Sequence, residues 1–257
     1  MKRRTFLTAL AASPGLSRAA APWHVSRREA DIALSAGAVL HRFSVSGEDS
    51  ADFQVVRFSS SRCTLRVIDQ NEADAVHLDE AMPRLDAIAG VNGGFFKPNF
   101  DPLGLVIAQG QRAGAWQKSS LLGGVVMVKN GRPLLLWRDE FQDSARITEL
   151  LQAGPRLVNN GASVSGLDSK ASRPRTFIAT DNAGQWLIGI GAYTSLAHLA
   201  QILALPGLVP GMEIARALNF DGGKSTALWA RTRAGSVISE SEFGKVRNFV
   251  AILPRNQ

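Results

Sequence analysis

Short strand-like segments separated by turn signals run through most of this chain. Residues 52–69 (DFQVVRFSSSRCTLRVID) read as two strands around a serine-rich turn, and residues 104–114 and 123–137 read as hairpins. Asn130-Gly131, inside the second hairpin, is the strongest turn signal in the sequence. Residues 175–192 predict a third hairpin, and residues 247–254 a closing strand. The pattern therefore predicts a fold built mainly from antiparallel pairs of strands.

Three segments carry a helical pattern instead. Residues 78–85 predict a short helix, residues 144–154 (SARITELLQAG) have helical spacing and end at a glycine, and residues 194–205 predict an amphipathic helix. Hairpins combined with isolated helices predict an α+β fold, with a largely antiparallel or mixed β-sheet core and a few flanking helices. No segment resembles a linker, so we expect one domain over residues 22–257.

The N-terminus has the layout of an export signal. Residues 1–21 have a basic head, a short apolar run and a small-residue end, and they are too short for an anchor. Arg3-Arg4 followed by Thr-Phe-Leu also resembles a twin-arginine signal, which predicts the twin-arginine export machinery as a partner and a periplasmic or secreted protein. An ordinary secretory signal with two chance arginines is the alternative. Pro22, after Ala19–Ala21, leaves the cleavage position open within one or two residues.

Composition excludes several classes of protein. The net charge is +7, but residues 1–21 hold four basic residues and no acid, so the mature chain carries only +3. That charge argues against a nucleic-acid binder, although it permits a local basic pocket for an anion. Beyond the N-terminus no run approaches the roughly 20 apolar residues of a membrane span, so we expect no stable membrane anchor. Cys63, the only cysteine, is predicted to be a buried strand residue, and the four histidines show no metal-ligand spacing, so neither metal nor cofactor is predicted.

Two Gly-Gly motifs are the candidates for chemistry. Residues 91–96 read VNGGFF and residues 219–223 read NFDGG, so each pair of glycines follows a strand-like run and a polar group, Asn92 or Asp221. Paired glycines allow a tight turn and a close approach of the backbone to a ligand, and successive N–H groups in such a turn can surround an anion. A plain turn is the alternative for either motif alone.

Two further motifs have residue types that occur in phosphate-binding sites. Residues 222–226 (GGKST) do not form a nucleotide-binding P-loop, because Leu218 occupies the position where that loop requires a glycine. Arg173 and Arg175 flank Pro174 at the entrance to a strand, and an arginine can hold a phosphate or carboxylate through two parallel hydrogen bonds. A solvated strand end is the alternative interpretation of that stretch.

Taken together, these stretches resemble the phosphodiester glycosidase family. The family pattern is Asn-Gly-Gly-Phe-Phe, a Gly-Pro-x-Leu-Val stretch before Asn-Gly, Pro-Arg-Thr, and Asn-x-Asp-Gly-Gly-x-Ser. The matching segments occur here in the same order, as residues 92–96, 154–158 with 160–161, 174–176 and 219–225. The resemblance covers about residues 88–250, and residues 22–85 add little to it.

The resemblance implies an exported hydrolase that cleaves the bond between the anomeric carbon of a sugar and a phosphodiester, on a glycan or another envelope component. A phosphate is a much better leaving group than an alkoxide, so a strong general acid matters less than in most glycosidases. The implied roles are an anion clamp at Arg175 and the Gly-Gly amides, and a carboxylate at Asp221 that acts as nucleophile, base or stabiliser of the cationic sugar. Asn92 completes the implied catalytic set, and the implied substrate-binding set is Gly93, Gly94, Thr176, Gly222, Gly223, Lys224 and Ser225.

The chain departs from the family pattern at two places. Lys224 stands where the family usually has a third glycine, and residues 189–192 (GIGA) replace an Asp-Gly that commonly ends the strand after Pro-Arg-Thr. These departures motivate two alternatives. One is a non-catalytic periplasmic protein that binds phosphorylated glycans in the same pocket, and the other is an enzyme of the same fold that acts on phosphodiesters of envelope or capsular polymers.

Overall fold

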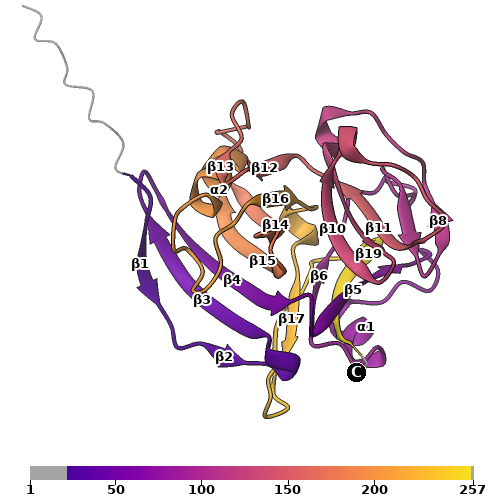
Figure 1. The fold of residues 1–257 in the computed structure, drawn as a ribbon, viewed down its shortest axis with the longest axis horizontal. Coiled ribbons are helices and arrows are strands. Elements are labelled where there is room, and N and C mark those ends of the chain that lie inside the picture. The colour runs from indigo at the N-terminus through magenta and orange to yellow at the C-terminus, as the bar shows by residue number, and fades with distance from the viewer. Residues whose placement is uncertain (1–21, 256–257) are drawn as a thin grey trace, which may run out of the picture.

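The computed structural model describes residues 22–255, so the predicted export signal at residues 1–21 lies outside the described part (Figure 1). Three sheets and two α-helices make up the described residues, and every strand pair within the sheets is antiparallel. The expectation of a largely antiparallel core is confirmed. The α+β assignment is corrected, because strands dominate the chain and the helices are few and short.

The largest sheet carries the strands that lead to the candidate site. Its order is β1-β3-β4-β15-β14-β16-β12-β13, with β2 paired to β3. The bounds are β1 His24–Arg28, β2 Ile32–Ala33, β3 Val39–Ser46, β4 Ser50–Ser59, β12 Arg156–Asn159, β13 Ala162–Ser163, β14 Arg173–Thr180, β15 Gln185–Thr194 and β16 Arg216–Asn219. Helix α2, Leu196–Leu203, packs on one face of this sheet, where its apolar side chains share one buried cluster with those of β4, β12, β14 and β15.

Two smaller sheets cover the other face. One has the order β10-β9-β11-β7-β8, with β7 Val106–Ala108, β8 Gln111–Ala113, β9 Gly124–Lys129, β10 Arg132–Trp137 and β11 Ile147–Ala153. The other has the order β18-β17-β6-β19-β5, with β5 Cys63–Asp69, β6 Ala89–Asn92, β17 Leu228–Arg231, β18 Val237–Glu240 and β19 Asn248–Pro254. Helix α1, Leu78–Arg84, packs on this second sheet against β6 and β17.

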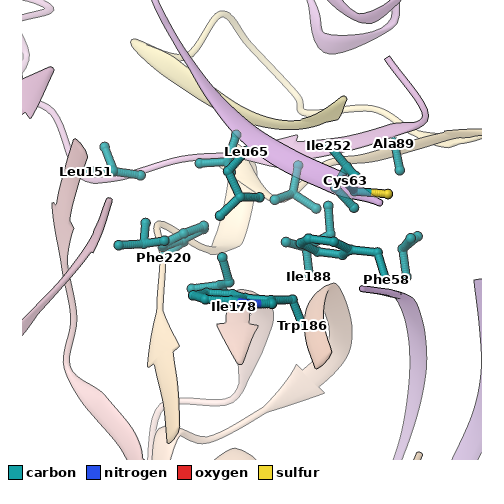
Figure 2. Close-up of a cluster of buried hydrophobic side chains, with 14 of the residues drawn as sticks. Phe58, Cys63, Leu65, Ala89, Leu151, Ile178, Trp186, Ile188, Phe220 and Ile252 are labelled. Carbon is teal, nitrogen blue, oxygen red and sulfur yellow. The ribbon is translucent and has the colours of Figure 1, made fainter. Parts of the chain in front are cut away.

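A single apolar cluster joins the three sheets. Ile178 of β14 and Ile188 of β15 face Leu65 and Ile252 of the β5–β19 pair, and Leu151 of β11 closes the cluster (Figure 2). Successive side chains along a strand point to opposite faces of the sheet. Phe177, next to Ile178, therefore points to the other face, into the buried cluster between the largest sheet and helix α2. Because both faces of β14 are covered, its position in the molecule is fixed, and so is the chain that continues from its ends.

The local predictions hold at most positions. Cys63 is fully buried, and burial raises the pKa of its thiol to about 11. Asn130 and Gly131 both have positive φ, 51° and 71°, as a two-residue turn between β9 and β10 requires. The predicted hairpins, the closing strand and the helices at residues 78–85 and 194–205 are all present.

The predicted helix at residues 144–154 is wrong. Ile147–Ala153 is strand β11, the central strand of its sheet, paired with β9 on one side and β7 on the other. Glu149 and Gln152, which would lie on the solvated side of a helix, are buried instead. Their side chains bind backbone groups, Glu149 at Val67 N–H and Gln152 at Leu105 N–H. Partners distant in sequence thus override a local helical spacing.

Candidate functional site

The two Gly-Gly motifs lie against each other. The backbone N–H of Asp221 donates to the carbonyl of Gly93 at 2.9 Å, and the side-chain amide of Asn92 donates to the carbonyl of Asp221 at 2.7 Å. Strand β6 delivers the first motif and β16 the second, although 129 residues separate Asn92 from Asp221. The structure therefore assembles one site from two turns that the sequence shows only separately.

The other two motifs reach the same place. The hydroxyl of Thr176 donates to Asn92 Oδ1 at 2.6 Å, and the Phe220 N–H donates to the Thr176 carbonyl at 2.8 Å. The Asn219 N–H donates to the Pro155 carbonyl at 3.0 Å, and Asn219 Nδ2 donates to Gly154 O at 3.1 Å. All four stretches that carry the family resemblance thus converge on the segment that presents Asp221.

Asp221 is half-buried and lies where β16 ends. Burial raises the pKa of its carboxyl above the usual range, while hydrogen bonds from the Ser225 hydroxyl and from the Gly222 N–H, at 2.9 Å, act in the opposite direction. A short 3₁₀ turn, Gly223–Ser225, follows at once and reaches the surface at Lys224. A partly desolvated carboxylate held by oriented donors is an environment typical of functional acids and bases.

Asn92 organises the site from within. Its side chain is fully buried, and its Oδ1 also accepts a hydrogen bond from the Ala227 N–H at 3.0 Å. Together with the bonds from Thr176 and to Asp221, this connects three segments of chain through one amide. Asn92 was predicted as part of the catalytic set, and the structure gives it the geometry of a positioning residue.

Three of the four glycines pack against other parts of the chain on the side where a Cβ would stand. A Cβ on Gly93 would lie 2.1 Å from Asn248 Oδ1, and one on Gly222 would lie 2.7 Å from the Pro174 carbonyl. The N–H of Gly94 donates to Asn248 Oδ1 at 2.7 Å, and that of Gly93 to Asn248 O at 2.8 Å. The expectation that the Gly93 and Gly94 amides form part of an anion clamp does not match this arrangement.

Gly223 differs from the other three. It has a φ of +64°, and no atom lies within 4 Å of the position of an added Cβ. Such a backbone is strained for residues with a side chain, and the turn at this position faces open space. Gly223 and Lys224 are therefore the parts of the predicted substrate-binding set that the structure leaves most accessible.

Arg175 is largely committed to the protein. Only 8% of it is exposed, its Nε donates to Thr194 O at 3.0 Å, and its Nη2 donates to Ala171 O at 2.6 Å. Burial is the main cause that lowers its pKa, and the nearby Arg173 adds to that shift. Within residues 22–255 no carboxylate forms an ion pair with Arg175, so its positive charge can still attract an anion, through Nη1.

Sequence reasoning missed several polar residues around this site. Asn219, Thr226 and Asn248 are buried, and each has a side-chain atom without a hydrogen-bond partner in the described structure, namely Asn219 Oδ1, Thr226 Oγ1 and Asn248 Nδ2. Buried polar atoms usually bind a partner, which can be water or a ligand. The sequence does carry a signal for two of them, a polar residue at one end of an apolar strand: Asn219 is the last residue of β16 and Asn248 the first residue of β19.

A different cavity, of about 740 Å³, lies at the opposite ends of β14 and β15. Its walls include the turns around Ser60 and Ala183 and three arginines, Arg132, Arg216 and Arg255. Its lining contains no carboxylate, so it lacks the group that a glycosidase reaction needs near the anomeric carbon. We place the candidate site at Asp221 for this reason. Among residues 22–255, no group of three or more His, Cys, Asp or Glu side chains is arranged to hold a metal ion.

Comparison with known proteins gives one family and several solved structures of the same fold. The family model described as phosphodiester glycosidase matches residues 86–253. The catalytic domain of zebrafish N-acetylglucosamine-1-phosphodiester alpha-N-acetylglucosaminidase, auto-inhibited by its pro-peptide, has a TM-score of 0.60 at 15% identity, with 95% of this chain and 87% of that chain covered. No curated protein sequence matches the chain significantly.

Two bacterial structures have the same fold. A hypothetical protein from Synechocystis has a TM-score of 0.58 at 17% identity, with 85% of this chain and 62% of that chain covered. A "Putative exported protein" from Burkholderia pseudomallei has a TM-score of 0.53 at 14% identity, with 80% of this chain and 74% of that chain covered. No helix within residues 22–255 is both long enough and apolar enough to span a membrane.

Proposed function

Because the chain belongs to the phosphodiester glycosidase family, we propose that it hydrolyses the bond between the anomeric carbon of a sugar and a phosphodiester. The observation that carries the proposal is the convergence of all four family motifs on the turn that presents Asp221. The substrate is a glycan or envelope component, and the protein meets it after export, directed by the Arg3-Arg4 signal.

The chemistry follows from the leaving group. The C–O bond at the anomeric carbon breaks, the electron pair leaves with the phosphate, and water supplies the hydroxyl that remains on the sugar. The phosphate needs little protonation, whereas the sugar develops positive charge, which the Asp221 carboxylate stabilises or attacks directly. Two cations can hold the phosphate: Lys224, which is exposed within the turn, and Arg175, whose Cα lies 3.6 Å from the position of an added Cβ on Gly222 and which has N–H groups left to donate.

The position of bond cleavage tests the reaction. Incubation of the protein with a panel of sugar-1-phosphodiesters in ¹⁸O-labelled water should release free sugar and a phosphomonoester, with the label on the anomeric oxygen of the sugar. Label in the phosphate would mean that a P–O bond breaks, and it would replace this proposal with a phosphodiesterase. No turnover on any substrate, together with binding of the sugar phosphates, would favour the non-catalytic binding protein that the Lys224 departure motivates.

Replacement of Asp221 tests the residue. Asp221→Asn keeps the acceptor for the Gly222 N–H but removes the charge, so we expect a loss of about 100-fold or more in kcat with little change in KM. Asp181→Asn is the matched control, because Asp181 also accepts backbone N–H bonds, from Ala183 and Gln185, at a hairpin tip away from the site. An Asp221→Asn protein with unchanged kcat would remove Asp221 from the mechanism.

A further inference from the structure

An exposed aromatic ring lies beside the Asp221 turn. Phe243 is 82% exposed, the most of any large apolar side chain in the described residues. Its N–H donates to the carbonyl of Lys224 at 2.8 Å, and the Lys224 ammonium lies 5.2 Å from the centre of its ring. A single exposed apolar side chain is common on protein surfaces, but this one lies beside the candidate catalytic turn and next to a cation, and an aromatic ring paired with a cation can bind a ligand.

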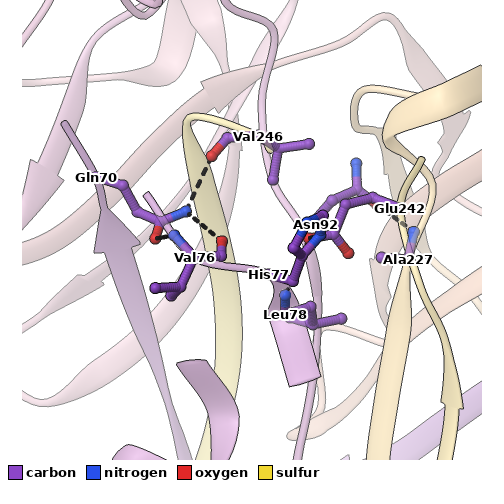
Figure 3. Close-up of polar contacts among 8 residues, drawn as sticks. All are labelled: Gln70, Val76, His77, Leu78, Asn92, Ala227, Glu242 and Val246. Carbon is purple, nitrogen blue, oxygen red and sulfur yellow. Dashed lines mark hydrogen bonds and ion pairs between the residues drawn. The ribbon is translucent and has the colours of Figure 1, made fainter. Parts of the chain in front are cut away.

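The segment that carries Phe243 is held firmly. We call residues 241–247 the strap. Glu242 in the strap is buried, and its Oε1 accepts hydrogen bonds from the Leu78 N–H at 3.0 Å and contacts His77 Nδ1 at 3.1 Å (Figure 3). At the other end, the Gln70 side chain donates to the Val246 carbonyl at 2.9 Å (Figure 3). Next to Val246, Arg247 forms an ion pair with Asp69.

These contacts fix the place of the ring without burying it. The strap is bound to helix α1 through Glu242 and to the strand β5 region through Val246 and Arg247, so the backbone of Phe243 has little freedom. Its N–H bond to Lys224 links the strap directly to the 3₁₀ turn after Asp221. A ring carried on an ordered backbone has only its own side-chain torsions to fix when a ligand packs on it, which favours binding.

We propose that Phe243 and Lys224 form a subsite for the leaving-group side of the substrate, with a sugar ring stacked on Phe243 and the adjoining phosphate on Lys224. The inference rests on the proposed function and deepens it. The C–H groups on one face of a pyranose ring form an apolar surface that packs on a flat aromatic ring. The ammonium of Lys224 has a flexible stem, so it can leave the ring for the more favourable charge of a phosphate.

The location of the pair assigns it to the leaving-group side. Asp221 is half-buried and faces the anomeric carbon in the proposed reaction, whereas Lys224 and Phe243 lie farther out, at the surface. A phosphodiester joined to a sugar at the deeper end therefore extends its other substituent toward Phe243.

A binding measurement tests the subsite independently of turnover. Glucose 6-phosphate and inorganic phosphate serve as probes, titrated against the wild-type protein by calorimetry. We expect the sugar phosphate to bind at least about tenfold more tightly than inorganic phosphate, and Phe243→Leu to remove most of that difference. Phe243→Tyr should retain it. Val237→Ala, which changes another exposed apolar side chain, is the control and should bind like wild type. Equal binding of both probes to the wild type would overturn the proposal.

Kinetics separate this inference from the proposed function. Two substrates share the same sugar-1-phosphate, and one carries a methyl group and the other a hexosyl group on the phosphate. Phe243→Leu should raise KM about tenfold for the hexosyl substrate and leave the methyl substrate unchanged. Turnover of both substrates without any effect of Phe243→Leu would refute the subsite and leave the function standing. Phe243-dependent binding of glucose 6-phosphate without turnover of either substrate would refute the function and leave the subsite standing.

Discussion

Replacement of Asn92 by alanine should destabilise the protein strongly, because one amide holds three separate segments. The change removes the acceptor of the Thr176 hydroxyl and of the Ala227 N–H, and the donor to the Asp221 carbonyl. Thr176 and Ala227 are fully buried, so water cannot replace their lost partner, whereas the Asp221 segment is half-exposed and can be hydrated.

The magnitude follows from the number of orphaned groups. A buried polar group left without a partner costs about 1–3 kcal/mol, so two such groups cost about 2–6 kcal/mol of the free energy of unfolding. The whole free energy of unfolding of a typical domain is only about 5–15 kcal/mol. In a domain of this size each kcal/mol lowers Tm by about 2–4 °C, so we expect Asn92→Ala to melt at least about 4 °C below wild type.

Thr176→Val is the matched comparison. It keeps the shape of the side chain and removes one donor, while Asn92 Oδ1 still accepts the Ala227 N–H, so its cost should be about 0.5–1.5 kcal/mol. In the double variant the hydroxyl that Asn92→Ala orphans is absent. The double variant should therefore be destabilised by about 1 kcal/mol less than the sum of the two single variants. Urea unfolding of the four proteins measures this, and additive costs or an Asn92→Ala protein as stable as Thr176→Val would refute the reasoning.

The remaining predictions concern Asp221, Arg175 and the Arg3-Arg4 pair. The pKa of Asp221 is raised in the folded protein, so folding disfavours its charged form and Asp221→Asn should raise Tm at neutral pH. This gain in Tm should shrink as the pH falls through the raised pKa of the folded state, and it should vanish below the ordinary Asp pKa of about 3.9. A lower Tm at neutral pH would contradict it. Arg175→Lys should lose at least one of its two carbonyl contacts, which should lower the free energy of unfolding by about 1–2 kcal/mol. It should also lower kcat/KM for a sugar phosphodiester, because lysine lacks the paired donors of arginine. Unchanged kinetics would show that Arg175 does not bind the phosphate. Changing Arg3 and Arg4 together to lysine should stop accumulation of the mature protein in the periplasm, as followed by cell fractionation, and normal levels would show that an ordinary secretory signal suffices.

The sequence was a good guide wherever the signal was local. The Asn130-Gly131 turn specifies its hairpin through two residues that tolerate positive φ, and the alternating apolar residues at 52–69 specify two strands. It could not show that these two strands, β4 and β5, belong to different sheets, because that depends on their partners. The helical spacing at residues 144–154 failed for the same reason, since β7 and β9 enclose that segment on both sides.

The candidate site divides in the same way. The order of the four motifs is legible in the sequence and was sufficient to indicate the family and to single out Asp221. The sequence did not reveal why Gly93 and Gly222 must be glycines. Their neighbours are Asn248, 155 residues from Gly93, and Pro174, 48 residues from Gly222, and those contacts exist only in the folded chain.

The sequence by itself determined which chemical groups are available, namely a carboxylate after a strand, an arginine beside a strand entrance and a lysine directly after the second pair of glycines. Only the tertiary structure decided which of these groups reach solvent. It turned the amides of Gly93 and Gly94 inward to Asn248, committed Arg175 to two carbonyls, and left Lys224 beside an exposed Phe243. Hydrogen-bond capacity is a property of each residue, but whether a neighbour already uses it depends on packing between segments that are far apart in the chain.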